Sequence, residues 1–109
     1  MGRYLGEFEQ TVLVALVRCG GEATGGRIHA EILDRTGRDS SISAVYVTLK
    51  RMSDKGYVAI REPGALSTTM GRGKNRYTLT GAGAAELGRT REMFERLWRG
   101  VDPDTLAAT

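Results

Sequence analysis

Residues that cross-link or metallate small proteins are almost missing from this sequence. Its 109 residues include one cysteine, Cys19, and one histidine, His29. A single cysteine cannot form an internal disulfide, which excludes a disulfide-stapled secreted scaffold. A structural zinc site usually takes four cysteine or histidine ligands, so the sequence predicts no metal site, and no motif in it indicates a cofactor.

Long apolar runs are also absent. No stretch approaches the roughly 18 apolar residues that a membrane span requires, and the segment Met1–Tyr4 contains no apolar signal region. The length is that of one domain, and 40% hydrophobic with 27% charged residues is an ordinary composition for a soluble chain. We therefore expect a cytoplasmic protein with no membrane partner.

Enzyme motifs are incomplete wherever they begin. Gly73-Lys74 is followed by Asn75 and a predicted strand, whereas a phosphate-binding P-loop needs Ser or Thr and then a helix. Gly81-Ala82-Gly83 opens a predicted helix, but Glu86 stands where a dinucleotide fingerprint has its last glycine. His29 has no nucleophile as a partner in sequence. We predict that the chain is not an enzyme.

The excess positive charge is concentrated in one segment. The whole chain has a net charge of +3, and residues 61–80 alone carry four basic side chains against the single acid Glu62. The residues before and after this segment are close to neutral. By itself the segment is equally compatible with a solvated loop and with a binding surface.

Apolar spacing predicts three helices in the first half of the chain. They run over residues 5–18, from Thr24 to Gly37, and from Ser41 or Ser43 to about Lys55, because apolar residues recur there three or four apart. The side chains expected to face the core are Leu5, Phe8, Val12, Ala15, Leu16, Cys19, Ile28, Ile32, Leu33, Val45, Leu49 and Met52.

The period then changes to that of β-strands. Residues 57–60 and 76–79 predict a β-hairpin with a long basic tip, and Thr80 caps a last helix that reaches about Gly100. The predicted fold is mainly α with a small β-hairpin. It consists of a winged helix-turn-helix domain at 1–80, a C-terminal dimerisation helix at 81–101 and a flexible tail at 102–109.

The second and third helices, joined by a short turn, predict a helix-turn-helix that binds double-stranded DNA in the major groove. The hairpin that follows is the wing, whose cations reach the phosphate backbone or the adjacent minor groove. Two alternatives stay open: Tyr46 packs on the neighbouring helix, and Lys50 with Arg51 covers a solvated face. The predicted DNA-binding residues are Ser41, Ser43, Tyr46, Lys50, Arg72, Lys74 and Arg76.

The last helix carries a second apolar pattern, with a repeat of seven residues. Because the other elements already supply a core, we expect this seam to pack against a second copy of the chain and form a homodimer. A two-fold axis places the two third helices about 34 Å apart, one turn of duplex. The alternative is a helix that folds back on its own domain. The predicted interface residues are Leu87, Phe94, Leu97, Trp98 and Val101.

Four segments together resemble the PadR family of bacterial transcriptional regulators: Leu5–Gln10, Ser41–Met52, Lys55–Val58 and Gly71–Thr80. The resemblance covers roughly residues 5–100. It implies a homodimeric winged-helix repressor that binds a palindromic operator and dimerises through its C-terminal helix. It also implies that the residue matching Tyr46 lies at the DNA surface and that the wing contacts the backbone.

The chain departs from the family's pattern at Thr24, where a tyrosine is usual before the glycine that matches Gly25. Its single C-terminal helix resembles the short-tailed subgroup, some members of which bind flat aromatic or cationic compounds on a tryptophan between subunits. The resemblance therefore implies a small-molecule effector at Trp98, for which dimer packing is the alternative role. The other class of function is a winged-helix protein-interaction module without DNA readout.

Overall fold

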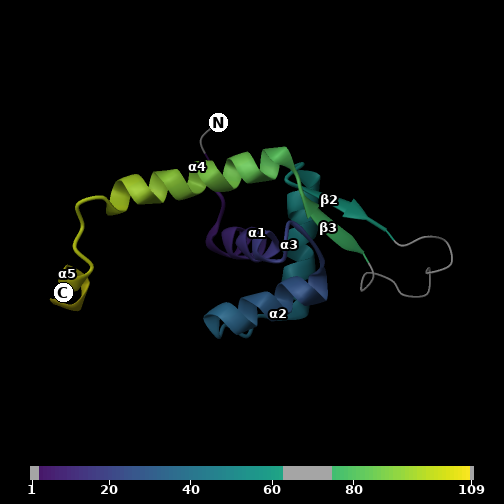
Figure 1. The fold of residues 1–109 in the computed structure, drawn as a ribbon, viewed down its shortest axis with the longest axis horizontal. Coiled ribbons are helices and arrows are strands. Elements are labelled where there is room, and N and C mark those ends of the chain that lie inside the picture. The colour runs from purple at the N-terminus through teal and green to yellow at the C-terminus, as the bar shows by residue number, and fades with distance from the viewer. Residues whose placement is uncertain (1–2, 63–74, 109) are drawn as a thin grey trace.

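The fold is mostly helical, with a small antiparallel sheet at one end (Figure 1). The computed structural model describes residues 3–62 and 75–108. In chain order, the elements of these residues are α1 (Glu7–Arg18), β1 (Glu22–Thr24), α2 (Gly25–Thr36), α3 (Ile42–Asp54), β2 (Val58–Arg61), β3 (Arg76–Leu79), α4 (Gly81–Trp98) and α5 (Asp104–Ala108).

Side-chain caps start three of the helices where the sequence predicts them. The hydroxyls of Thr24, Ser41 and Thr80 each accept a hydrogen bond from a backbone N–H in the first turn of α2, α3 and α4, at 3.0–3.2 Å. Ser41, not Ser43, is therefore the cap of α3. At the other end of α2, Gly37 adopts a left-handed conformation with φ of 72°, which glycine tolerates without strain.

The sheet contains the predicted hairpin and one strand that the sequence analysis missed. β3 lies in the centre, and it pairs antiparallel with β2 on one side and with β1 on the other. β1 has only three residues, too few for an alternating pattern to stand out. Its position depends on a tertiary contact: the Leu79 N–H donates to the Gly21 carbonyl at 2.9 Å.

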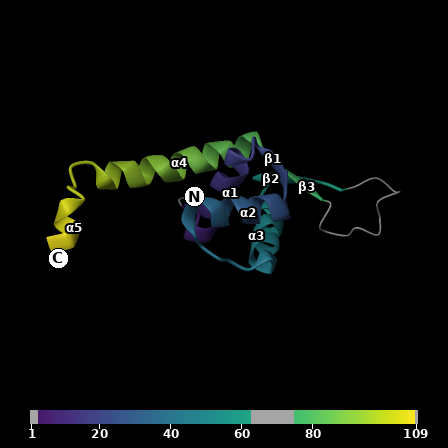
Figure 2. The ribbon, with the colours of Figure 1, turned by 60° about the horizontal axis from the view of Figure 1, so that its bottom comes forward.

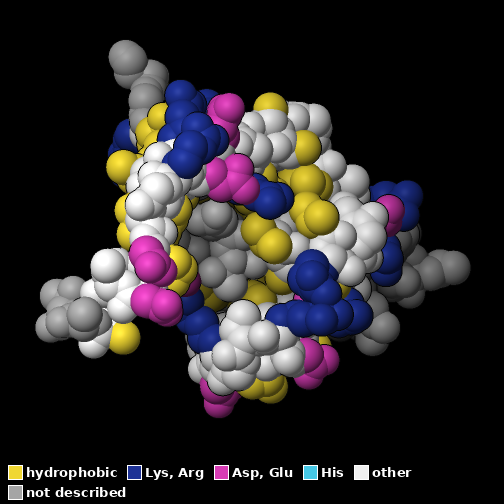
Figure 3. Space-filling model, turned by 60° about the vertical axis from the view of Figure 1, so that its left-hand side comes forward, with side chains coloured by type: hydrophobic (Ala, Val, Ile, Leu, Met, Phe, Trp, Pro, Cys, Tyr) yellow, Lys and Arg dark blue, Asp and Glu magenta, His cyan; other side chains and the backbone are white. Residues whose placement is uncertain are grey.

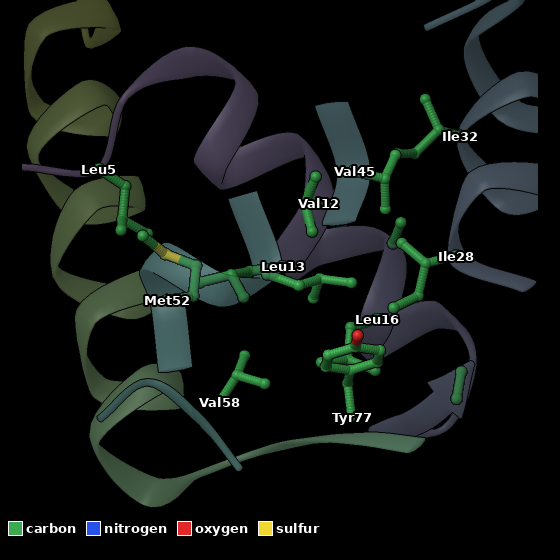
Figure 4. Packing of buried hydrophobic residues seen from close by; sticks show 13 residues of the cluster. Leu5, Val12, Leu13, Leu16, Ile28, Ile32, Val45, Met52, Val58 and Tyr77 are labelled. Atoms are coloured by element: carbon green, nitrogen blue, oxygen red, sulfur yellow. The ribbon is translucent and has the colours of Figure 1, made fainter. Parts of the chain in front are cut away.

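The core lies between the first three helices and the inner face of the sheet (Figure 4). Tyr77 reaches into it from β3 beside Leu16, as Figure 4 shows. The predicted inward residues of α3 and most of those of α1 are buried, but Phe8 and Cys19 are only half-buried, and the completely buried Leu13 was not predicted. On α2, Leu33 is 41% exposed. The buried stripe of α2 runs through Ile28 and Ile32, and Leu33 lies about 100° further around the helix.

The buried face of α2 also contains a carboxylate, whereas only apolar residues were predicted to face the core. Glu31 is only 6% exposed, and three arginines surround it: Arg18, Arg27 and Arg35, at N···O distances of 3.0–3.1 Å. Hydrogen bonds from Arg35 and Arg18, together with the charge of Arg27, lower the pKa of this carboxyl. The cluster joins α1 to α2, since Arg18 is the last residue of α1.

Helix α4 packs on α1 with its first half and then projects beyond it (Figures 1 and 2). Gly83 allows the first turn of α4 to approach the backbone of Tyr57, because a Cβ at position 83 would lie only 2.2 Å from the Tyr57 carbonyl oxygen. Thr90 is fully buried and accepts a hydrogen bond from the Leu5 N–H at 3.2 Å. Every residue from 94 to 107 is exposed.

The last residues form the short helix α5, where the sequence analysis expected a frayed tail. The Asp102 carboxylate accepts from the Asp104 N–H, and this turn starts the helix. Within residues 3–62 and 75–108, no helix combines the length and the apolar character that crossing a membrane requires.

Candidate functional site

Helix α3 presents a polar face to solvent. Ser41, Ser43 and Lys50 are all exposed, as is Val47 between them, while the opposite face of the helix is buried. Lys50 is not isolated, since its Nζ lies 2.7 Å from the Asp54 Oδ1. The first turn of α3 also leaves backbone N–H groups near Ser43 without a helical partner, which is where a phosphate binds favourably.

Tyr46 occupies a different position from the other predicted residues of α3. It is half-buried, and its ring lies against the first residue of α2: a Cβ on Gly25 would be 2.4 Å from the Tyr46 Cε1. Its ring centroid is also 6.4 Å from that of Tyr77 on β3. Tyr46 therefore joins α3 to α2 and to the sheet, and packing on the neighbouring helix accounts for part of its surface.

The base of the wing carries a cluster of three charges on the outer face of the sheet. Arg61 of β2 and Arg76 of β3 are direct cross-strand partners. The Oε2 of Glu22 on β1 accepts from both, at 3.0 Å from Arg61 Nη2 and 2.9 Å from Arg76 Nε. These hydrogen bonds lower the pKa of the Glu22 carboxyl, and the bond from Arg76 has the larger effect. Of the predicted wing residues, Arg72 and Lys74 lie outside the described residues.

Arg61 was counted in the basic segment but was not among the predicted DNA-binding residues, and Glu22 was not predicted because the strand that brings it to the wing was missed. One signal was available. Glu22 lies between Gly21 and the capping Thr24, so a short extended segment fits there, but its pairing with the hairpin is seen only in the structure. Alternation then places Glu22 and Thr24 on one face and the buried Ala23 on the other.

The contacts of His29 and Cys19 indicate structural roles. The His29 Nε2 lies 2.6 Å from the Ser40 carbonyl oxygen, which fixes the turn just before the capping Ser41. Cys19 is half-buried at the end of α1, and burial raises the pKa of its thiol. Among the described residues, no group of three or more His, Cys, Asp or Glu side chains is arranged to hold a metal ion.

The predicted seam divides into two parts. Leu87 is half-buried against the core of its own chain, whereas Phe94, Leu97, Trp98 and Val101 are 43–66% exposed. Phe94 and Trp98 also line a shallow cavity of about 440 Å³, together with Gln10, Arg91 and Glu95. Figure 3, seen from the side toward which α4 projects, shows hydrophobic side chains next to groups of Lys and Arg.

Comparisons with known proteins agree on one fold. Residues 12–89 match the family model described as "Transcriptional regulator PadR-like family". F93 from STIV, a winged-helix DNA-binding protein, superimposes with a TM-score of 0.70 at 22% identity, over 87% of this chain and 95% of that one. The hsRosR-S4 complex gives 0.70 at 22% identity, over 94% and 80% of the two chains. No curated protein matches significantly in sequence.

A ligand-regulated protein also shares this fold. BpsR of Bordetella bronchiseptica, whose DNA binding is regulated by 6-hydroxynicotinic acid, superimposes with a TM-score of 0.63 at 19% identity, over 95% of this chain and 73% of that one. At identities of 19–22% these structures establish the winged-helix architecture alone.

Proposed function

The chain belongs to the PadR-like family of transcriptional regulators, and from this premise we propose that it is a repressor that binds a palindromic operator as a homodimer. Its family and fold are those of transcription regulators, which are not enzymes.

The observation that carries the DNA contacts is the exposed polar face of α3 beside the arginines of the wing. Ser41, Ser43 and Lys50 lie on that face, and Arg76 lies on the adjacent sheet. We assign Lys50 to base edges or phosphates and the two serines to phosphates at the helix start. Arg72 and Lys74 of the wing are assigned to the phosphate backbone from the sequence alone. We assign Tyr46 to a DNA contact at the edge of this surface.

The homodimer is supported by the exposed apolar residues at the end of α4 and just beyond it. A helix that displays Phe94, Leu97 and Trp98 to water, followed by the exposed Val101, is unfavourable unless another surface covers these residues. A second copy supplies the same residues, and a two-fold axis brings them together in a self-complementary interface. The exposed half of the seam is then the centre of the dimer, while Leu87 lies at its edge.

The decisive experiment is a footprint of the protein on the DNA upstream of its own gene. We expect a protected region with two-fold symmetry and half-sites one helical turn apart. Affinity for no duplex, or equal affinity for that DNA and for random sequence, would overturn the repressor and favour the protein-interaction module.

Salt dependence separates backbone contacts from base contacts. Log K should fall by about 0.9 for each neutralised phosphate per log unit of salt. Lys74→Ala and Arg72→Ala should reduce this slope on every duplex, whereas Tyr46→Phe should change the preference between sites if the hydroxyl contacts a base. Arg96→Ala, an equal loss of charge on α4, is the control and should leave the slope almost unchanged.

The cavity beside Trp98 supports a flat aromatic or cationic effector. Trp98 and Phe94 offer aromatic faces, and the Glu95 carboxylate lines the same cavity. The chain has a single tryptophan, so its fluorescence reports on this site. A planar cationic dye should quench that fluorescence and weaken operator binding. If the dye weakens DNA binding of the Trp98→Ala protein to the same extent, Trp98 is not the site.

A further inference from the structure

The outer face of the sheet holds two cations in an arrangement that is unfavourable by itself. Arg61 and Arg76 face each other across β2 and β3, and like charges at directly opposed positions destabilise a strand pair. On β1, Glu22 pairs with Thr78, two residues along β3 from Arg76. Alternation therefore places Glu22, Arg61 and Arg76 on the same face, opposite the buried Tyr77.

One oxygen atom relieves this repulsion. The Oε2 of Glu22 accepts from Arg61 Nη2 and from Arg76 Nε, so a single negative charge bridges two guanidinium groups. A DNA phosphate likewise offers guanidinium groups two charged acceptor oxygens, although the phosphate is tetrahedral and the carboxylate planar. The side chains of Arg61 and Arg76 are 74% and 46% exposed, so a phosphate can reach both.

We propose that Glu22 is an intramolecular substitute for a DNA phosphate, which holds Arg61 and Arg76 together in the free protein and competes with the backbone for them. This inference rests on the proposed DNA binding. In the complex, a phosphate takes over the two arginines, and the released carboxylate lies beside a like charge. Glu22 therefore lowers the affinity for any duplex. It orients Arg61 and Arg76 for contact with DNA, but it also competes with DNA for them.

The test compares two proteins with the same net charge. Glu22→Gln removes the competing charge and keeps the shape of the side chain. Glu92→Gln removes an equal charge on α4, where Glu92 pairs with Arg96 at 3.5 Å. Binding to a fluorescent duplex of random sequence is measured by anisotropy over a range of salt concentrations. We expect Glu22→Gln to bind about tenfold more tightly than the control, with a salt slope steeper by about 0.9 per additional phosphate contact.

A double-mutant cycle separates competition from a structural role. Arg76→Gln should weaken binding more in the Glu22→Gln background than in the wild-type chain, because only in the wild-type chain must Arg76 give up its ion pair with Glu22 to contact phosphate. A structural role alone predicts equal or weaker binding by Glu22→Gln and no such coupling, and either result overturns the inference. If the wild-type protein binds no duplex, the proposed function fails as well. If it binds and Glu22→Gln matches the control, only this inference fails.

Discussion

The winged-helix body, which we define as residues 3–62 and 75–93, contains a buried hydrophobic core, whereas the far half of α4 leaves its apolar residues exposed. In the body, Leu13, Leu16 and Leu49 are completely buried by their own chain. Beyond Met93, every described residue is exposed up to position 107, and among them are the aromatic rings of Phe94 and Trp98. The same chain therefore contains one region with a buried hydrophobic cluster and one in which no apolar side chain is buried.

The difference follows from what each region can pack against. α1, α2 and α3 meet one another and the sheet, so the buried face of each helix has partners within the chain, while apolar residues on their other faces, such as Val14 and Leu33, stay exposed. The far half of α4 projects beyond α1, and nothing else in the described chain covers it (Figure 2). Exposed apolar residues with a regular spacing indicate an interface, whereas the same residues in the body indicate a core.

The largest expected effect is on the stability of the body, when its core is disrupted. Leu16→Ala should lower the free energy of unfolding by about 3 kcal/mol, because it leaves a cavity in a fully packed core. Leu33→Ala is the matched control: it removes the same atoms from a side chain that is 41% exposed, and should cost much less. Urea denaturation followed by circular dichroism measures both. Equal losses would contradict the core described here.

The next effect concerns the projecting region. Trp98→Ala should raise the dissociation constant of the dimer by about thirtyfold, since truncating a buried aromatic at an interface centre costs on the order of 2 kcal/mol. Sedimentation velocity over a dilution series measures this constant, and helix content should stay unchanged. Glu92→Ala, on the same helix outside the seam, should leave it unaltered. A dimer that survives Trp98→Ala intact does not use the seam.

The two regions also differ in how far the sequence predicted them. Apolar spacing and local caps predicted the helices: Thr24 and Thr80 cap α2 and α4 as expected, and of the two candidates Ser41 and Ser43 the structure has Ser41 as the cap of α3. The seam was found by its spacing, but only the structure shows that Leu87 belongs to the core and the remaining seam residues to solvent.

The missed features all depend on residues far apart in the chain. Glu31 is buried because arginines from two helices converge on it, and no local pattern indicates that convergence. Thr90 is buried because it meets Leu5, 85 positions away. Glu22 belongs to the wing only through β1, a strand too short to be recognised by alternation. Tertiary contacts of this kind are not encoded in the spacing of one segment.

An effect of similar size tests how the packing of Tyr46 on Gly25 positions α3. Gly25→Ala should cost about 2 kcal/mol of stability, because the new methyl group would overlap the Tyr46 ring and push it out of its site. Gly26→Ala is an ideal control: a Cβ there meets nothing within 4 Å, and alanine in the helix should add about 0.5–1 kcal/mol. Thermal unfolding of both proteins gives the sign of each change. Two substitutions of the same sign would mean that Tyr46 does not pack on Gly25.

The smallest expected effect is the dependence of the α1–α2 junction on pH. The pKa of Glu31 is lowered in the folded chain, so its ion pairs stabilise the fold above the ordinary value near 4.5, and this stabilisation is lost as the pH falls through the lower, folded value. Glu31→Gln should therefore lower the melting temperature by a few degrees at neutral pH, and the difference from wild type should shrink on acidification. Glu92→Gln, at an exposed pair, should change the melting temperature little at any pH. A Glu31→Gln difference that stays constant down to acidic pH would assign the effect to packing of the side chain instead of its charge.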